Sequence, residues 1–467
     1  MHCRSAGRAI TVLFATTLVA CHGDAAPTPD APSTDGARLI ALSGDHVNAD
    51  PGAESPESLT VALLNGSGRR IPGMRITWTA TSGGTVQDAS TVTDENGLAH
   101  ASWIFANGDV SQTASASFGA AEESFHGLLR QSPDIPIDTL LPVELTTFDG
   151  SNQVVHPDVM FLPRSWSGGS VRLAMAITPY PNGDQHFENP SLYVSDAGAT
   201  WTMLATARNP VVRPEAGYLS DPSLVFETST QLLLMYYREV SNGDNVILRV
   251  GTPDGAQWGM PLEVIRVPSD GLVSPSVVRR SATNWFMWSV NAGLLGCSAP
   301  AAAVEVRHSV DGTQWDAPIR VALDQPGGYP WHIDVNWIPA LHEYWALYNL
   351  KSPGNCVTPA VYLATSPDGV QWTTYPRPVL QRGAIDAFAD VVYRSSFIYT
   401  KADDMVTLYY SGARWDGTHY VWSAAVQRRT RAALFASIQA PGTFTLRPPR
   451  SSLPNPEGAL EAPLRVP

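Results

Sequence analysis

Ser309-Val-Asp-Gly-Thr-Gln-Trp315 recurs along the chain as Ser366-Pro-Asp-Gly-Val-Gln-Trp372, and two earlier copies read Ser195-Asp-Ala-Gly-Ala-Thr-Trp201 and Thr252-Pro-Asp-Gly-Ala-Gln-Trp258. The four tryptophans are spaced 57 residues apart. Each copy predicts a tight turn, because aspartate accepts backbone N–H groups, glycine adopts a positive φ, and tryptophan then opens the following strand. A turn that returns at this period predicts repeated β-sheet units.

A second series runs in step with the turns and marks five strand starts. Each start is followed by a second apolar strand, as in Leu232-Leu-Leu-Met-Tyr-Tyr237. The five starts are His156-Pro-Asp-Val-Met160, Ser220-Asp-Pro-Ser-Leu224, Val273-Ser-Pro-Ser-Val277, His332-Ile-Asp-Val-Asn336 and Phe388-Ala-Asp-Val-Val392. The turns resemble the Asp-boxes of sialidase-like propellers, which join the third and fourth strands of a blade. We therefore predict an all-β chain with a five-bladed β-propeller over residues 140–438, closed by a strand from 139–148 or from the segment after Ala432.

Composition excludes several classes of protein. The 467 residues are 44% hydrophobic and 16% charged, which argues against a disordered polymer, a coiled coil or a collagen-like repeat. A formal net charge of -13 argues against nucleic acid as a partner. The 14 Trp and 15 Tyr residues favour β-structure and are side chains that can stack on sugars.

The N-terminus has the pattern of an export signal. Arg4 and Arg8 precede an uncharged stretch that ends in Leu18-Val-Ala-Cys21, which resembles the lipobox of bacterial lipoproteins. The resemblance implies that the signal region 1–21 is cleaved before Cys21, that Cys21 becomes the lipidated first residue of the mature chain, and that the protein is located in the bacterial cell envelope. An ordinary signal peptide with an incidental cysteine is the alternative. Residues 22–37 are rich in Pro, Ala and Asp and predict a linker.

Residues 38–130 predict a separate β-sandwich, since short alternating stretches are separated by turns that contain Gly and Asn. Segments such as Ile71-Pro-Gly-Met-Arg-Ile-Thr-Trp78 resemble bacterial immunoglobulin-like domains, which act mostly as spacers or adhesive modules. Trp78 and Trp103 are expected in its core. Residues 439–467 form a Pro-rich tail.

Two cysteines remain after export besides Cys21, and they are 59 residues apart, close to one repeat period. Cys297 and Cys356 both follow the second strand of their blades, so we expect a disulfide between neighbouring loops; two free thiols are the alternative. The chain has no C-x-x-C and no H-E-x-x-H pattern, so no sequence motif predicts a zinc site.

Inner strands line the channel of a propeller, so residues at their starts are expected to meet at one mouth. The expected set is Asp158, Asp221, Ser274, Asp334 and Asp390, ringed by Glu188, Arg238, Glu239, Asn291, Asn349, Lys351, Arg414 and Asp416. Aromatic residues expected near this rim, where they could stack on a sugar, are Tyr237, Trp331, Tyr410 and Trp415. Several carboxyl groups in one cleft raise one another's pKa, which provides an acid and a base at the same pH.

The five blades, the Asp-Pro strand openings and the lipoprotein signal together resemble the five-bladed propeller glycosidases of the arabinanase, xylosidase and invertase-like families. The resemblance implies that Asp158 is base or nucleophile and that Asp221 or Asp334 tunes its pKa. The glutamate that opens a later blade in those enzymes is absent here, and Glu188 is our candidate acid. Glu188 could instead pair with an arginine such as Arg213 or Arg238, and each inner aspartate could simply bond the backbone of a neighbouring blade.

Binding roles are expected from the same resemblance and from the position of residues around the mouth. His332 matches a channel histidine that binds a structural cation, so we expect either a Ca²⁺ ion there or a donor to substrate, and no organic cofactor. The expected substrate-binding residues are His156, Tyr237, Arg238, Trp331, His332, Asp390 and Arg414.

Three functions are open at this point. A surface-anchored, monomeric glycoside hydrolase is the leading hypothesis. A catalytically silent glycan-binding or adhesive lipoprotein is the second. A sialidase-like hydrolase is the third, in which Arg238 and Arg414 would hold a substrate carboxylate. A separation of ~5 to 9.5 Å between two catalytic carboxyl groups would favour hydrolysis over binding.

Overall fold

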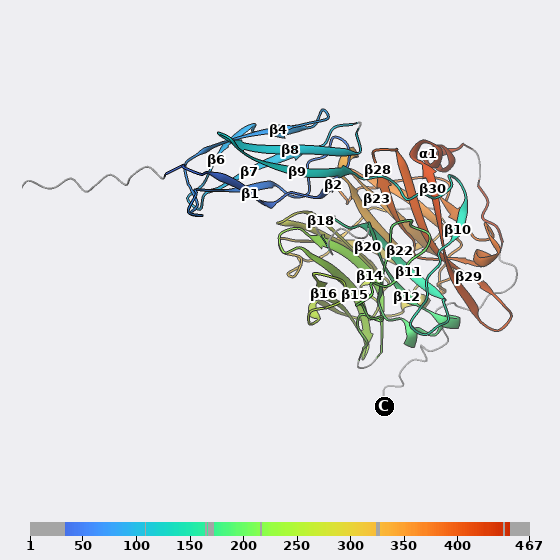
Figure 1. The fold of residues 1–467 in the computed structure, drawn as a ribbon. Helices are drawn as coiled ribbons and strands as arrows, with labels where there is room; N and C mark the ends of the chain where they lie inside the picture. Colours follow the sequence, from blue (N-terminus) through green and yellow to red (C-terminus); the bar gives the residue numbers. More distant parts are fainter. Residues whose placement is uncertain are drawn as a thin grey trace, which may run out of the picture.

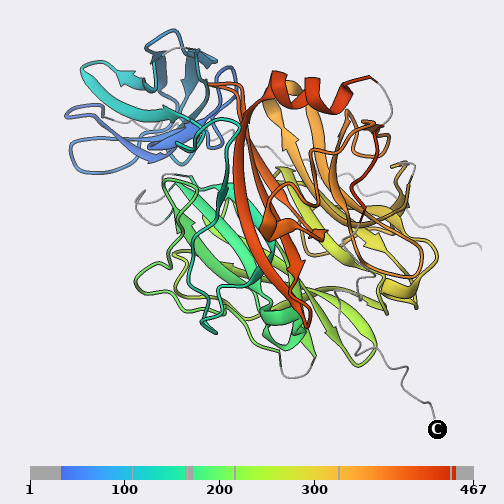
Figure 2. The ribbon, with the colours of Figure 1, turned by 90° about the vertical axis from the view of Figure 1, so that its right-hand side faces the viewer.

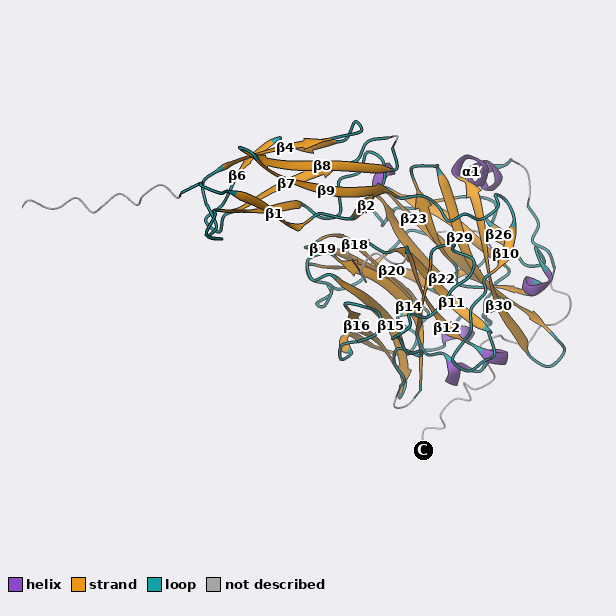
Figure 3. Cartoon of the chain, in the orientation of Figure 1, coloured by secondary structure: helices purple, strands orange, loops and turns teal. Residues whose placement is uncertain are grey.

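The computed structural model describes residues 33–448, apart from 108, 164–165, 167–171, 215–216, 324–326 and 442–443. Cys21, the signal 1–21, most of the linker 22–37 and most of the tail 439–467 lie outside the described residues. The described chain is almost entirely β-structure, as Figure 3 shows. Among these residues, no helix has the length and hydrophobicity needed to cross a bilayer.

The N-terminal part is a β-sandwich of two sheets (Figure 1). One sheet has the order β1 (Arg38–Ser43), β3 (Leu59–Leu64), β7 (Leu98–Ile104) and β5 (Thr85–Gln87). The other has the order β2 (Val47–Ala49), β9 (Ala121–Leu129), β8 (Ser111–Phe118), β4 (Arg75–Ala80) and β6 (Ser90–Val92). Trp78 and Trp103 are buried in the core between the sheets, which confirms their prediction as core residues. Alternating burial along β4 and β8 reflects one inward and one solvent-facing side.

Five further sheets in the described chain form the propeller, and its all-β five-bladed fold is confirmed. Blade 1 contains β11 (Val154–Phe161), β12 (Leu173–Pro179) and β13 (Ser191–Ser195), with the 3-10 helices η2 (Pro181–Gly183) and η3 (Gln185–Phe187) between the last two. Blade 2 contains β14 (Tyr218–Glu227), β15 (Leu232–Ser241), β16 (Asp244–Thr252) and β17 (Leu262–Pro268). Figure 2 shows the blades arranged around a common centre.

Blade 3 contains β18 (Val273–Ser281), β19 (Asn284–Asn291), β20 (Ala303–Ser309) and β21 (Ile319–Arg320), with η4 (Gly296–Ser298) after β19. Blade 4 contains β22 (Tyr329–Ile338), η5 (Pro339–Leu341), β23 (Glu343–Lys351), β24 (Ala360–Ser366), β25 (Thr373–Thr374) and β26 (Leu380–Gln381). Blade 5 contains β27 (Val391–Val392), β28 (Ser396–Thr400), β29 (Met405–Trp415) and β30 (Tyr420–Thr430), preceded by η6 (Asp386–Phe388) and followed by the helix α1 (Arg431–Gln439).

The ring closes through the strand β10 (Leu140–Pro142), which pairs antiparallel with β30, so that Leu140 faces Gln427. The outer strand of blade 5 therefore comes from the N-terminal side of the propeller. It lies within 139–148, one of the two segments predicted to close the ring. The other segment, after Ala432, lies in α1 and packs its buried Leu434 and Ile438 on the blade 5 core.

The repeated turns have the local structure that the sequence predicts, and each lies directly after the third strand of its blade. In the third copy, the Asp311 carboxylate accepts the N–H groups of Thr313 at 2.7 Å and Gln314 at 2.9 Å, and Gly312 has a φ of 70°. The Asp254 and Asp368 turns make the same bonds. The first copy differs, because Ala197 stands where the other three copies have this aspartate, and its Asp196 accepts the Arg172 N–H.

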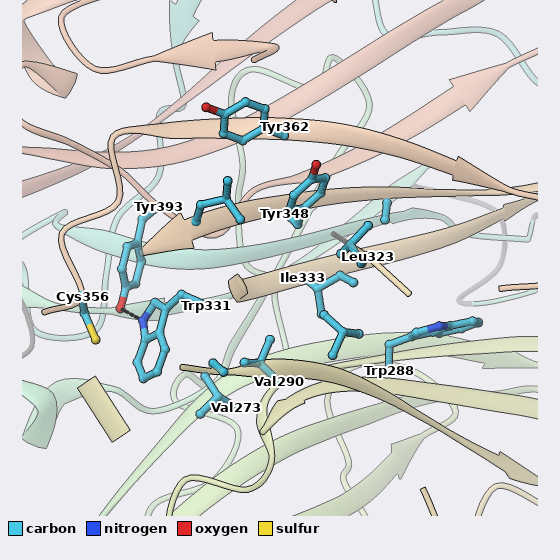
Figure 4. Close-up of a cluster of buried hydrophobic side chains, with 14 of the residues drawn as sticks. Val273, Trp288, Val290, Leu323, Trp331, Ile333, Tyr348, Cys356, Tyr362 and Tyr393 are labelled. Atoms are coloured by element: carbon cyan, nitrogen blue, oxygen red, sulfur yellow. Dashed lines mark hydrogen bonds between the residues drawn. The ribbon is translucent and has the colours of Figure 1, made fainter. Parts of the chain in front are cut away.

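The predicted disulfide between Cys297 and Cys356 is present, with a Cα–Cα distance of 5.2 Å. It joins the loops that follow β19 and β23. The buried Lys351 ammonium reinforces the same junction by donating to the carbonyls of Cys297 and Ala299, both at 2.9 Å. Figure 4 shows Cys356 beside the core of blades 3 and 4, where the Trp331 indole N–H donates to the Tyr393 hydroxyl at 3.2 Å.

Hydrogen bonds join the sandwich and the propeller. The Gln231 amide of blade 2 donates to Glu57 at 2.9 Å, and the Asn48 amide donates to the Leu162 carbonyl at 3.3 Å. Pro133, which follows the sandwich, accepts from the Arg428 guanidinium at 2.8 Å.

Candidate functional site

Each inner strand of the propeller is interrupted by a β-bulge. The strand register shifts between Val155 and Asp158 in blade 1, and equivalent shifts occur in blades 2 to 4 and in the gap between β27 and β28. In the first three blades the bulge residue has a positive φ: 58° at His156, 52° at Asp221 and 56° at Ser274. Non-glycine residues in this conformation cost about 1 to 3 kcal/mol each and gather at functional sites.

The bulges define two sets of equivalent residues. We call the residues at the bulges the bulge ring and the residues two positions further along each strand the seam ring. The bulge ring comprises His156, Asp221, Ser274, His332 and Arg394. The seam ring comprises Asp158, Ser223, Ser276, Asp334 and Ser396.

The seam ring ties neighbouring blades together. Ser223 accepts the Val277 N–H at 3.0 Å, and Ser276 accepts the Val335 N–H at 2.8 Å. The Asp158 carboxylate accepts the Leu224 N–H in the same way. Ser396 joins blade 5 to blade 1 by accepting the Val159 N–H at 3.1 Å. Asp158 and Asp334 approach each other across the channel. Burial, chiefly, raises the pKa of both carboxyl groups, and their mutual repulsion adds to the rise for Asp334.

The bulge ring instead converges on the Asp221 carboxylate. Asp221 Oδ1 lies 3.6 Å from His156 Nε2, 3.5 Å from His332 Nδ1 and 3.6 Å from Arg394 Nη1. The exposed fraction is 1% for Asp221, 2% for His332 and 4% for His156. We call His156, Asp221 and His332 the donor triad. Its three facing atoms have no hydrogen-bond partner of good geometry among the described residues, although all three are polar and buried.

Electrostatics set the protonation of the donor triad. Burial, chiefly, lowers the pKa of His156 well below its usual value and also lowers that of His332. Burial alone would raise the pKa of Asp221, but His156, His332 and Arg238 together hold it well below its usual value. Near neutral pH the two imidazoles are therefore neutral and the carboxylate is ionised, which is the form in which these side chains bind metal ions.

Side chains around the triad orient it. Glu188, which ends η3, places Oε1 at 3.4 Å from His156 Nδ1, so that His156 Nε2 faces Asp221. The ring centroid of Tyr393 lies 4.2 Å from that of His332 and 5.4 Å from that of His156. A carboxylate on the second nitrogen of a histidine is the usual support of a metal-binding imidazole.

A narrow pocket opens onto the triad. Arg238 reaches it from β15, with Nη1 at 3.6 Å from Asp221 Oδ2 and Nη2 donating to the Tyr218 hydroxyl at 2.9 Å. The residues that line the pocket are His156, Tyr180, Gln185, Glu188, Tyr218, Ser220, Asp221, Arg238, His332 and Tyr393.

The donor triad fits a transition-metal ion. At bond lengths of ~2.1 Å, two ligands of a tetrahedral metal lie ~3.4 Å apart. The distances of 3.5 and 3.6 Å from Asp221 Oδ1 to the two imidazole nitrogens are close to that value. Two imidazoles with one carboxylate suit Zn²⁺, Fe²⁺ or similar ions better than Ca²⁺, which prefers oxygen ligands. No motif predicted this group, because its members come from three different blades.

The predicted site residues separate into two groups. The pocket contains Glu188, Asp221, Arg238 and the two histidines His156 and His332. Asp158 and Asp334 do not line it and lie in the seam ring. The prediction that Asp158, Asp221, Ser274, Asp334 and Asp390 meet in one depression is wrong, because only Asp221 of the five lines the pocket. Asp158 and Asp334 are two residues out of register with Asp221 and Ser274.

Asp390 was misplaced because the inner strand of blade 5 begins later than predicted. Asp390 precedes β27 and accepts the Trp415 N–H at 2.8 Å. The positions equivalent to the bulge and seam residues of the other blades are Arg394, in the gap between β27 and β28, and Ser396, which begins β28. Tyr237 and Tyr410 are fully buried in core clusters and Trp331 is 2% exposed, so their faces are not available to a sugar. Arg414 and Asp416 are exposed and outside the pocket.

The remaining rim residues have local partners. The buried Asn349 amide donates to the Ala360 and Val392 carbonyls, and the Asn291 amide donates to Glu305. Glu239 accepts from the Ser241 hydroxyl. Arg213 stacks on Phe148, and one partner of Glu188 is His156.

Sequence reasoning missed Arg394, Tyr393, Tyr218, Tyr180 and Gln185. A signal for Arg394 was present, since Arg394-Ser-Ser-Phe397 repeats the pattern of Ser274-Pro-Ser-Val277 and Asp221-Pro-Ser-Leu224. The other residues lie where the sequence carries no periodic signal: Tyr180 follows β12, Gln185 begins η3 and Tyr218 begins β14.

Comparison with known proteins relates the chain to carbohydrate-processing enzymes. No family model matches it. It is 29% identical over 343 residues to the A type blood N-acetyl-alpha-D-galactosamine deacetylase of Flavonifractor plautii. That match covers 63% of this chain but 43% of the relative, so less than half of the relative's length has a counterpart here.

The chain is also similar to solved structures, and the first of these shares its fold. An N-acetylgalactosamine deacetylase from F. plautii, in complex with blood group B trisaccharide, matches with a TM-score of 0.60 and 22% identity over 66% of this chain and 99% of that one. An alpha-L-arabinanase from Penicillium chrysogenum, complexed with arabinobiose, has a TM-score of 0.41 and 11% identity over 62% of this chain and 97% of that one.

Proposed function

We propose that this protein is a metal-dependent carbohydrate deacetylase that hydrolyses the acetamido group of an N-acetylated hexosamine in a glycan, with N-acetylgalactosamine as the first substrate to test. The donor triad carries this proposal. It provides two neutral imidazoles and one carboxylate at the base of a pocket, and the F. plautii relative whose name states this activity is similar over 63% of the chain.

His156 Nε2, Asp221 Oδ1 and His332 Nδ1 would hold the metal, since these three atoms lie within 4.8 Å of one another. A divalent ion bound there would supply Lewis-acid polarisation of the acetamide carbonyl and activation of a water molecule. Arg394, beside Oδ1, and Arg238, beside Oδ2, balance the charge of Asp221. Tyr393 packs against both imidazoles and restricts their rotation.

Glu188 is the proton carrier in this proposal. Its carboxyl group lines the pocket beside the triad, while one oxygen faces His156 Nδ1 at 3.4 Å. In the reaction the oxygen of water bonds to the carbonyl carbon, the C–N bond breaks, and acetate and a free amine are formed. Glu188 would take a proton from the water and return it to the departing nitrogen. The Arg238 guanidinium and the Tyr218 hydroxyl lie where they can donate hydrogen bonds to sugar oxygens.

The two-carboxylate glycosidase mechanism has less support. Its expected base, Asp158, faces the seam between blades and bonds the Leu224 N–H instead of lining the pocket. Glycoside hydrolysis is therefore an outcome that the activity assay must distinguish from deacetylation.

The test is an assay of two products from N-acetylgalactosamine-terminated oligosaccharides. We expect release of acetate without release of a monosaccharide, loss of activity after chelation, and recovery on adding Zn²⁺, Mn²⁺, Fe²⁺ or Co²⁺. Glu188→Gln, whose side-chain oxygen can still face His156 Nδ1, should retain bound metal but release acetate at least about a hundredfold more slowly. Release of monosaccharide without acetate would replace deacetylation by glycoside hydrolysis. Absence of both products across a panel of N-acetylated glycans would leave glycan binding as the function.

We also propose that the enzyme works as a monomer tethered to the cell envelope through Cys21, because Leu18-Val-Ala-Cys21 resembles a lipobox. Mass spectrometry of the mature N-terminus, with Cys21→Ser as the control, tests the tether, and a soluble wild-type product would contradict it. Size-exclusion chromatography with light scattering measures the molar mass in solution, which should equal that of one chain; twice that mass would contradict the monomer.

A further inference from the structure

A second group of metal-binding side chains lies on the β-sandwich, away from the donor triad. Asp45 and His46 belong to the loop between β1 and β2, and His126 lies on β9. The potential ligand atoms of these three residues lie within 4.8 Å of one another. Nothing in the proposed deacetylation uses them.

The geometry of this group resembles a preformed coordination site. Asp45 Oδ1 lies 3.3 Å from His126 Nδ1, and Asp45 Oδ2 lies 3.4 Å from His46 Nε2. Each distance, one from either carboxylate oxygen, is close to the ~3.4 Å that separates two ligand atoms on a tetrahedral metal with bonds of ~2.1 Å. The two imidazole rings are nearly parallel, with centroids 5.7 Å apart and an interplanar angle of 18°.

The backbone holds the central carboxylate in place. Asp45 Oδ1 accepts the N–H of His126 at 2.7 Å and that of His46 at 2.9 Å. The orientation of Asp45 is therefore set before any ion arrives, and only the two imidazoles have to adjust.

Exposure distinguishes this group from the donor triad. The side chains of His46 and His126 are 60% and 56% exposed, so an ion can reach them directly from solvent and keep water on its remaining positions. Asp45 also lines a groove of about 670 Å³ that continues to Thr228, Ser229 and Gln231 of blade 2.

We propose that Asp45, His46 and His126 form a second metal site, which takes one divalent transition-metal ion such as Zn²⁺ or Ni²⁺ on the surface of the sandwich. Two imidazoles and one carboxylate select these ions over Mg²⁺ and Ca²⁺. Three protein ligands leave at least one coordination position open. The site is independent of the proposed deacetylation, because it shares no ligand with the donor triad.

The experiment counts bound metal in the full chain. Protein stripped with a chelator is loaded with Zn²⁺, separated from free ion, and analysed by atomic spectroscopy. We expect the His46→Ala/His126→Ala double variant to bind one equivalent fewer than the unchanged protein. His100→Ala, which removes another histidine of the same sandwich, should bind the full amount.

The difference of one equivalent does not depend on the propeller site. If the donor triad binds no metal, the count falls from one to zero, and if it binds one ion, the count falls from two to one. Equal counts in the double variant and the unchanged protein would overturn the proposal.

Chemical labelling gives a second measurement that needs no variant. Zn²⁺ should protect His46 and His126 from modification by diethyl pyrocarbonate, as measured by peptide mass spectrometry, and should leave His100 reactive. Modification of His46 and His126 at an unchanged rate would also overturn the proposal.

Discussion

The bulge ring and the seam ring lie two residues apart on the same five strands, yet their chemistry differs. The seam ring consists of three serines and two aspartates that lie where neighbouring blades meet. Four of these five side chains do the same thing, which is to accept a backbone N–H from the next blade. The bulge ring has two histidines, an aspartate, a serine and an arginine, and four of its side chains converge on one point. In this repeat fold, the seam-ring position is nearly uniform and stabilises the blade contacts. The bulge-ring position, two residues earlier, varies from blade to blade and supplies the chemistry.

The largest expected effect comes from a bulge-ring ligand. His332→Gln should lower deacetylation by about 10³-fold or more, equivalent to ~4 kcal/mol of transition-state stabilisation, because it removes one of three metal ligands. Bound metal should fall in parallel, while the melting temperature changes little, since a neutral amide replaces a neutral imidazole. Turnover within tenfold of the unchanged enzyme would mean that the donor triad is not the reaction centre.

Removing the disulfide should lower the stability of the fold without selectively changing the chemistry of either ring. Cys297→Ala/Cys356→Ala opens a link between residues 59 apart, which should cost about 2 to 4 kcal/mol of unfolding free energy. Denaturant unfolding measures this cost, and turnover at a temperature where the variant is folded should stay close to that of the unchanged protein. A selective loss of activity without loss of stability would place the loop junction in the site.

A seam-ring substitution should show the opposite pattern to His332→Gln. Asp158→Ala leaves the buried Leu224 N–H without its acceptor and should cost about 1 to 3 kcal/mol, while turnover of the folded protein is kept. Asp158→Asn retains an acceptor oxygen and is the matched control. If Asp158→Asn folds normally but does not turn over substrate, Asp158 has the catalytic role that the family resemblance implied. The division of roles, stability in the seam ring and chemistry in the bulge ring, would then be wrong.

The smallest effect is expected outside both rings, in the repeated turns. Hydrogen bonds from the backbone of Gln314 and Thr313 lower the pKa of Asp311, so its stabilisation is present above its unfolded pKa of ~3.9 and is lost as the pH falls below that value. Asp311→Ala should therefore lower the melting temperature slightly at pH 7. The difference from the unchanged protein should shrink below about pH 4. A difference that does not depend on pH would show that Asp311 does not act through its charge.

Periodicity made most of the fold predictable. The five strand starts, in step with the tryptophans, indicated the number of blades, and the phase of Cys297 and Cys356 within the repeat indicated their disulfide. The closing strand was narrowed to two segments, because a propeller needs a partner for its last blade. These predictions succeeded because turn chemistry and hydrophobic alternation are local properties that recur from blade to blade.

The site was only partly predictable, because its chemistry depends on register. The sequence identified His156, Glu188, Asp221, Arg238 and His332, but it treated Asp158 and Asp334 as equivalent to Asp221. A β-bulge shifts a strand by one residue without a unique sequence signature, and a shift of one or two residues decides whether a side chain faces a seam or the pocket. The donor triad escaped prediction because its spacing of 65 and 111 residues is set by the blades and by no local motif.

The pairing of β10 with β30 has a mechanical consequence. The strand that completes the last blade follows the sandwich along the chain, so a force that pulls on the N-terminal side travels through the backbone to the β10–β30 pair before it reaches the strands of blade 1. During synthesis the ring stays open until β30, the last strand, has left the ribosome and can pair with β10. The donor triad joins blade 1 to blades 2 and 4, so the β10–β30 pair is one of the contacts that hold the walls of the pocket together.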